Sequence, residues 1–214
     1  MASLRELLAA HQSLLLIDAA STLVQVGRLE AQPGATPPFR SRWHASSEEA
    51  GVAIFRGLEA LAVKPTDAAA LVFCDGPGSV LGIRTSAMAM RTWRVLRPIP
   101  VFAYHSLALV AATLATSGLT VIADARRESW HTLSLGTQLS RIPTAELSGE
   151  LVMPENFRHW SKLPPGVRLT PYRVEELLSR AIDSDLFRAS DAPDAFLHEE
   201  PSYATWTPQV HRAP

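Results

Sequence analysis

Two kinds of hydrophobic pattern alternate along the chain. Short apolar runs that stop at a polar or turn residue are typical of buried strands, and they occur at 14–17, 68–73, 101–103 and 119–123. Apolar residues at helical spacing predict helices over 47–61, 85–96, 107–114 and 171–182. Strands interleaved with helices indicate an α/β fold.

Capping residues and prolines suggest where two of these helices begin. Ser46 and Glu49 have the spacing of a capping box, which would start a helix at this point. Thr170 is placed to cap a later helix whose first position is Pro171. The stretch 140–170 contains four prolines, and we expect it to be mostly irregular.

The chain contains a repeated pattern of a strand, an aspartate and a second strand. The aspartate is Asp18 in the first copy and Asp124 in the second. The repeat predicts two related subdomains. We expect an N-terminal extension over 1–13, a first α/β subdomain over 14–106, and a second, diverged α/β subdomain with an extended tail over 107–214.

Composition excludes several classes of protein. The 214 residues are 47% hydrophobic and 19% charged, as in globular proteins, and no apolar run approaches the roughly 18 residues of a membrane helix. The net charge of -1 gives no support for a broadly basic, nucleic-acid-binding surface. The single cysteine, Cys74, excludes an internal disulfide and a multi-cysteine zinc site, so a cytoplasmic protein is expected.

A glycine-rich turn between a strand and a helix is the most unusual segment, D-G-P-G-S-V-L-G-I-R at 75–84. Gly76, Gly78 and Ser79 could present backbone amides to an anion at the helix start. The alternative is a tight turn that requires glycine conformations. Neither the Walker spacing nor the dinucleotide spacing is present, so both interpretations remain open.

Asp18 could hold a magnesium ion or a water at the end of the first strand, or it could make a turn hydrogen bond to the backbone. Asp124 has the same alternatives, with Arg126 and Arg127 as possible ion partners. No two of the seven histidines have helical metal-ligand spacing, and no nucleophile elbow is present. We therefore predict no catalytic residue and no metal ligand.

The helix over 85–96 has apolar side chains on two sides. Ala89, Met90, Trp93 and Leu96 form one face, which can cover the sheet. Met88 and Val95 form another, flanked by Arg84 and Arg91. The second face could meet a partner chain, or the helix could be buried inside its own domain.

Several motifs together resemble those of the TsaB family, also called YeaZ, the partner subunit in bacterial threonylcarbamoyl-adenosine (t6A) modification of tRNA. They occur in the expected order: L-L-L-I-D-A-A-S at 14–21, G-P-G-S-V-L-G-I-R at 76–84, H-S-L at 105–107, I-A-D-A-R-R at 122–127 and a terminal P-x-Y element at 201–203.

The resemblance implies an actin-like (ASKHA), duplicated ribonuclease-H-type fold and a non-catalytic role as scaffold. It implies pairing with a TsaD-type catalytic subunit through the helices over 47–61 and 85–96, and a homodimer is expected when that subunit is absent. The implied partner interface consists of Val52, Phe55, Arg84, Met88, Arg91 and Val95. A TsaE-type ATPase joins such assemblies, ATP or ADP lies at the subunit interface, and tRNA is bound only through the complex.

Some residues depart from the family pattern. Ala19 and Ala20 follow Asp18 where the family has a hydroxyl residue, Leu81 replaces a threonine, and Glu128 replaces a glycine. The lost hydroxyls argue against the main alternative, an ATP-dependent small-molecule kinase or ATPase that uses Asp18. A peptidase is excluded because a metal-ligand pair and a nucleophile elbow are both missing.

Overall fold

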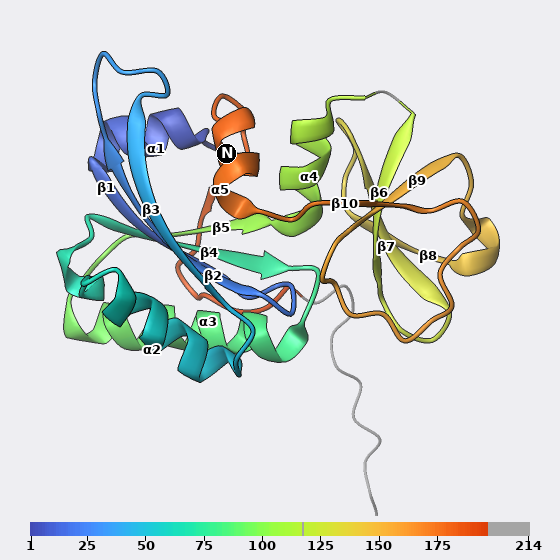
Figure 1. The fold of residues 1–214 in the computed structure, drawn as a ribbon, viewed down its shortest axis with the longest axis horizontal. Helices are drawn as coiled ribbons and strands as arrows, with labels where there is room; N and C mark the ends of the chain where they lie inside the picture. The colour runs from blue at the N-terminus through green and yellow to red at the C-terminus, as the bar shows by residue number, and fades with distance from the viewer. Residues whose placement is uncertain (117, 197–214) are drawn as a thin grey trace, which may run out of the picture.

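The computed structural model describes residues 1–116 and 118–196, and these form two β-sheets with helices around them (Figure 1). The first sheet has the strand order β11-β5-β4-β1-β2-β3 and the second has β10-β9-β6-β7-β8. The strands of the first sheet are β1 (Ser13–Asp18), β2 (Val24–Ala31), β3 (Phe39–Ser46), β4 (Ala70–Gly76), β5 (Val101–His105) and β11 (Arg188–Ala189). Those of the second are β6 (Leu119–Asp124), β7 (Ser129–Ser134), β8 (Ser140–Pro143), β9 (Glu150–Pro154) and β10 (Arg168–Thr170).

Five α-helices and two short 3-10 turns connect these strands in the described part of the chain. They are α1 (Leu4–His11), α2 (Ala50–Ala60), η1 (Pro65–Asp67), α3 (Val80–Leu96), α4 (Ser106–Leu114), η2 (Thr144–Glu146) and α5 (Val174–Arg180). Among the described residues, no helix has the length and apolar character needed to cross a membrane.

The two sheets repeat one topology. In the first, β1, β2 and β3 form an antiparallel meander, and β4 and β5 continue the sheet parallel to β1. In the second, β6, β7 and β8 form the meander, and β9 and β10 continue parallel to β6. Strands β1 to β5 therefore correspond to β6 to β10, which confirms the predicted α/β, actin-like duplication of a ribonuclease-H-type unit.

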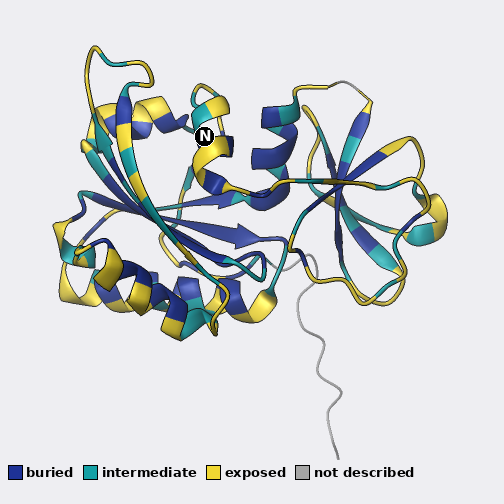
Figure 2. Ribbon diagram, in the orientation of Figure 1, coloured by how far each residue is buried: buried dark blue, intermediate teal, exposed yellow. Residues whose placement is uncertain are grey.

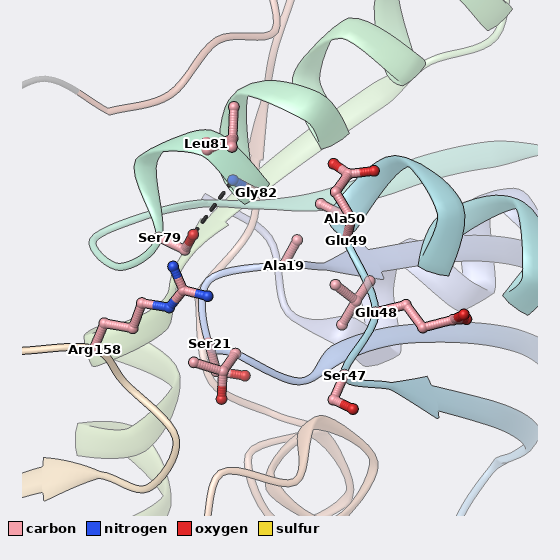
Figure 3. Close-up of a pocket in the computed structure, with 12 residues that line it drawn as sticks. Ala19, Ser21, Ser47, Glu48, Glu49, Ala50, Ser79, Leu81, Gly82 and Arg158 are labelled. Carbon is pink, nitrogen blue, oxygen red and sulfur yellow. Dashed lines mark hydrogen bonds between the residues drawn. The ribbon is translucent and has the colours of Figure 1, made fainter.

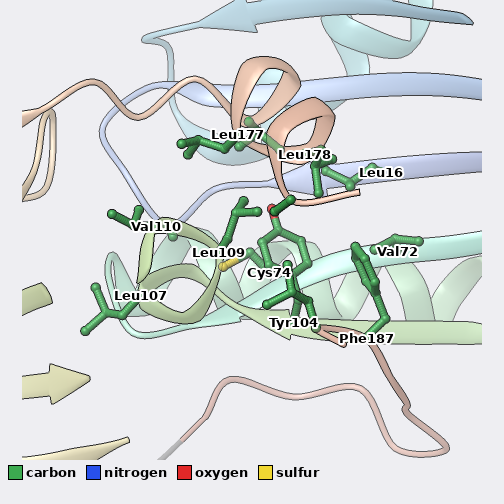
Figure 4. Packing of buried hydrophobic residues seen from close by; sticks show 14 of the residues in the cluster. Leu16, Val72, Cys74, Tyr104, Leu107, Leu109, Val110, Leu177, Leu178 and Phe187 are labelled. Atoms are coloured by element: carbon green, nitrogen blue, oxygen red, sulfur yellow. The ribbon is translucent and has the colours of Figure 1, made fainter. Parts of the chain in front are cut away.

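Helices cover the first sheet on both faces, whereas the second sheet has helices on one face only (Figure 1). Helices α2 and α3 pack on one face of the first sheet. Helices α4 and α5 lie between the two sheets and share one apolar core with both (Figure 4). Loop residues such as Leu147, Leu163 and Val167 cover the far face of the second sheet.

The N-terminal segment, expected as an extension over 1–13, contains a helix that packs into the core. Ser3 and Glu6 form a capping box that starts α1. The helix buries Leu4, Leu7 and Leu8 in the core between the sheets. A sequence pattern of eight helical residues cannot show this docking, because the partner surface lies elsewhere in the chain.

The chain also returns to the first sheet after the strands of the second sheet. Strand β11 pairs with β5, and Arg188 lies opposite Ala103. Gln25 of β2 donates to the Tyr172 carbonyl at 3.1 Å and accepts from the Val174 amide at 2.9 Å. These contacts join the beginning of α5 to the first domain.

Several element boundaries differ from the predictions because tertiary contacts decide them. Strand β3 was not predicted, and β8, β9 and β10 lie in the stretch expected to be irregular. Helix α2 is capped by Glu49 itself, while Ser46 ends β3. Thr170 ends β10, and the Gln25 side chain caps α5 in its place. Leu96, placed on the buried face of α3, is exposed.

Candidate functional site

Asp18 lies at the end of β1 and is completely buried. The hydroxyls of Tyr104 and Tyr172 donate to its Oδ2 at 2.6 and 2.7 Å, and the Ala20 amide donates to Oδ1 at 3.0 Å. Burial raises the pKa of Asp18, although the three donors act in the opposite direction. Burial also raises the pKa of the neighbouring Cys74 thiol well above its usual value.

These contacts decide what Asp18 can do. Both carboxylate oxygens are held by groups of the protein itself, and the side chain lines none of the cavities described below. The turn hydrogen bond to Ala20 is one of the two alternatives derived from the sequence. Because Tyr104 comes from β5 and Tyr172 precedes α5, Asp18 joins three distant segments in the core.

Asp124 occupies the corresponding place at the end of β6, and it also binds backbone. Its Oδ2 accepts from the amides of Trp160 and Ser161, both at 2.7 Å, and Oδ1 accepts from the amide of Arg126. Partial burial acts to raise the pKa of Asp124, but the amide donors hold it below its usual value. The expected ion pair with the Arg126 guanidinium is absent, since that group lies 4.4 Å above the Trp160 ring.

The glycine-rich turn packs against the backbone of the β1–β2 turn. A Cβ added at Gly78 would lie 2.3 Å from the Ala20 carbonyl oxygen, and one at Gly82 would lie 2.3 Å from that of Ala19. The Ser79 amide donates to the Ala20 carbonyl at 2.7 Å, and the Ser79 side chain caps α3. The glycines therefore permit close backbone contact, which supports the tight-turn interpretation.

A cavity of about 340 Å³ lies where this turn, the β1–β2 turn and the starts of α2 and α3 meet (Figure 3). Arg158 reaches it from the second domain. Glu48 and Glu49 also line it, and they are already engaged. Glu48 pairs with Arg56 at 2.9 Å, and Glu49 accepts from the first amides of α2. Two carboxylates beside the Arg158 guanidinium do not make a cradle for a polyphosphate. Of the proposed nucleotide-proximal residues, only Ser79 lines this cavity.

A buried ionic group at the end of β4 was missed by the sequence analysis. Asp75 contacts Arg188 and lies 2.9 Å from Nδ1 of His105. Burial lowers the pKa of His105, which favours the neutral ring. The group ties β11 to the glycine-rich turn and to β5. Because its members come from three segments, no local pattern could have revealed it.

Helices α2 and α3 of the first domain carry exposed apolar side chains on their outer faces. The two helices lie side by side and bury their inner faces against the sheet (Figure 2). Their outer side chains form what we call the α2–α3 surface: Val52 (44% exposed), Phe55 (66%), Leu81 (70%), Met88 (55%) and Val95 (87%). Arg84 and Arg91 lie on the same exposed face of α3, and Arg91 pairs with Asp194 at 3.1 Å.

The outer face of the helix over 85–96 is exposed in the described part of the chain. The Met90 and Trp93 side chains are buried against the sheet, whereas Met88 and Val95 are exposed. Among the described residues, the segment that carries Asp194 reaches the edge of this face through its ion pair with Arg91, while Val52, Phe55, Met88 and Val95 remain exposed. All six residues of the predicted partner interface therefore lie on exposed positions of α2 and α3.

No group of three or more His, Cys, Asp or Glu side chains within the described ranges is arranged to hold a metal ion. The fold and these sites define a two-domain, actin-like protein. In each domain, the aspartate at the end of the first strand accepts hydrogen bonds from other parts of the protein. The P-x-Y element at 201–203 lies outside the described residues.

The chain matches the family model of TsaD, described as tRNA N6-adenosine threonylcarbamoyltransferase, over residues 17–145. The match covers more than half of the chain, so the protein belongs to this family. No curated protein sequence matches it.

Two solved structures have the same fold. YeaZ from Pseudomonas aeruginosa is 18% identical with a TM-score of 0.60, and the match covers 87% of this chain and 100% of that one. A structure described as an uncharacterized protein with similarity to peptidase YEAZ from Pseudomonas aeruginosa is 17% identical, with the same TM-score and the same coverage. The resemblance to TsaB (YeaZ) is thus confirmed in the fold.

Proposed function

We propose that this protein is a TsaB-type, non-catalytic partner subunit that pairs with a TsaD-type catalytic subunit in the t6A modification of tRNA. The α2–α3 surface is the observation that carries the proposal. Contiguous exposed apolar side chains on a folded domain mark protein–protein contacts. The adaptable Met88 and the flanking Arg84 and Arg91 have the composition of an interface with a polar rim.

The state of Asp18 supports a scaffold rather than an enzyme. A carboxylate that holds magnesium or orients a phosphate must reach solvent or ligand. The Asp18 oxygens accept from Tyr104, Tyr172 and Ala20 inside the core. A kinase or ATPase that uses Asp18 would first have to break these contacts.

The wider assembly follows from the same proposal. A TsaE-type ATPase joins the pair, and tRNA binds to the complex. ATP or ADP is bound at the subunit interface rather than by this chain alone. The cavity at the start of α3 adjoins the α2–α3 surface through Leu81, so an added subunit would complete its wall. Without the partner, the same apolar surface favours a homodimer.

Co-expression with the host's TsaD-type protein, followed by light scattering of the eluted species, tests the proposal. We expect a one-to-one or two-to-two complex. Met88→Glu or Phe55→Glu should abolish it, because a carboxylate would be buried in an apolar contact. Leu169→Glu is the matched control, since Leu169 is 55% exposed on β10 of the second domain.

Two results would contradict the proposal. One is separate elution of the two proteins with ATP, ADP and a TsaE-type protein all present. The other is unchanged pairing of both glutamate variants. Circular dichroism of each variant shows whether the fold is intact. ATP turnover by the isolated chain would revive the enzyme alternative.

A further inference from the structure

A fixed, exposed aromatic side chain stands on the second domain beside the junction with the first. Trp160 is 60% exposed, and the Arg126 guanidinium lies 4.4 Å above its ring. The amides of Trp160 and Ser161 both donate to the buried carboxylate of Asp124. The backbone that carries the indole is therefore held in place. Arg126 covers one face of the ring, and the rest of the side chain is exposed.

Four exposed cations lie in the two short segments 125–128 and 156–162, the second of which contains this tryptophan. They are Arg126, Arg127, Arg158 and Lys162. None of them forms an ion pair with another described residue. Glu128 is the only acidic residue in the two segments, and Asp124 is turned inward onto amides. In a chain of net charge -1, the two segments thus form a locally basic strip, bordered in sequence by Glu155 and, in the cavity that Arg158 lines, by Glu48 and Glu49.

The strip borders two cavities at the junction of the domains, one of which is the cavity at the start of α3 described above. Trp160 and Arg126 line a cavity of about 100 Å³ with Gly78 and Val80 of the first domain. Arg158 lines the larger cavity with Leu81 (Figure 3). Both cavities adjoin the start of α3, where the α2–α3 surface begins. The basic strip and the proposed partner interface are therefore neighbours.

We propose that Arg126, Arg127, Arg158, Trp160 and Lys162 form a binding surface for an unpaired stretch of RNA. A nucleobase stacks on Trp160, and the cations contact the phosphates on either side. Proteins read single-stranded RNA by stacking bases on aromatic rings and by holding the backbone with arginine and lysine. A simple anion such as free phosphate would contact the cations but would not use the Trp160 ring, whereas RNA would use both.

The identity of the RNA rests on the proposed function: within a TsaD-type complex it is an unpaired region of the tRNA. Because the strip adjoins the α2–α3 surface, one tRNA can contact both subunits. This chain then contributes directly to tRNA affinity.

Fluorescence anisotropy with a labelled tRNA transcript tests the surface, using the complex and the isolated chain in parallel. Trp160→Leu should weaken binding about tenfold, the size expected for one stacked base, whereas Trp160→Phe should retain most of the affinity. Arg127→Gln with Lys162→Gln should lower the slope of log K against log salt by about 0.7 for each lost phosphate contact. Lys64→Gln is the control: it removes an exposed cation ahead of η1 in the first domain and should leave both quantities unchanged.

The proposal is overturned if Trp160→Leu binds like the unchanged protein. It also fails if the double variant alters the salt slope no more than Lys64→Gln does, because bulk charge would then explain the binding. Light scattering of the same samples reports pairing separately. If no complex forms, the proposed function fails, and the isolated chain still tests the RNA surface. If the complex forms and the variants have no effect, only the RNA surface is refuted.

Discussion

The Asp18 cluster allows a prediction that depends on pH. Tyr172→Phe removes one hydroxyl that donates to Asp18 at 2.7 Å and keeps the ring, which packs edge-on against Phe157 at 4.9 Å between centroids. Asp18 is 0% exposed, so water cannot replace the lost donor. The variant isolates one hydrogen bond to a buried carboxyl group.

The magnitude depends on the protonation state of Asp18. A hydrogen bond to a charged group contributes about 1.5–3 kcal/mol, and one between neutral groups about 1 kcal/mol. Because the folded pKa of Asp18 is raised by burial, the folded state binds the proton more tightly than the unfolded chain does. The stability linked to Asp18 is therefore fully present below the unfolded pKa of about 3.9 and is lost as pH rises through the folded pKa.

Loss of the Tyr172 donor raises that folded pKa further, since this hydroxyl lowers it in the native protein. The variant should be less stable by about 1 kcal/mol at acid pH. Its deficit should grow to about 1.5–3 kcal/mol above the folded pKa. Urea unfolding followed by circular dichroism from pH 4 to 9 measures the difference.

Thr113→Val provides the control. Thr113 is buried and donates to the Leu109 carbonyl at 2.7 Å, a neutral hydrogen bond without a titrating partner. Its loss should cost about 1 kcal/mol at every pH. A Tyr172→Phe deficit that is equally independent of pH would refute the proposed link between Tyr172 and the ionisation of Asp18.

Three further predictions follow from the turns. Glu128 has a φ of 54°, so Glu128→Gly should raise the free energy of unfolding by about 1 kcal/mol; a lower urea midpoint would contradict this. Gly82→Ala should lower the free energy of unfolding by about 1–3 kcal/mol, because the added Cβ would clash with the Ala19 carbonyl oxygen. Gly51→Ala in α2 is the control, and it should not lower the thermal midpoint. Because the folded pKa of Asp124 is lowered, its ionisation stabilises the fold above about pH 3.9, and this stability is lost as pH falls through the folded pKa. In Asp124→Asn, the free energy of unfolding should therefore fall less steeply as the pH is lowered.

Part of the candidate site could be predicted from local pattern. The exposed stripe of α3 follows helical spacing, so Arg84, Met88, Arg91 and Val95 could be assigned to one outer face. The glycine-rich turn was recognisable because three glycines and a proline within the ten residues 75–84 interrupt the apolar patterns on either side. Its contact with the β1–β2 turn could not be predicted, because the two turns are about 60 residues apart and meet only in the fold.

Trp160 and Arg158 had no detectable signal. They lie in a stretch without periodicity that contains several prolines. The Trp160 backbone is held by Asp124, which is more than 30 residues earlier in the chain. The same reason explains the missed β9. Its five residues form a strand because they pair with β6, not because their pattern requires one.

The α/β class and the outer face of α3 could be derived from the spacing of apolar residues within single elements, and the duplication from the repeated order of strand, aspartate and strand. The roles of Asp18 and Asp124 could not be derived in this way. A carboxylate at the end of a strand looks the same in a sequence whether it faces solvent or the protein. Here Tyr104, Tyr172 and the backbone amides reach these two carboxylates from other segments and turn them into internal acceptors.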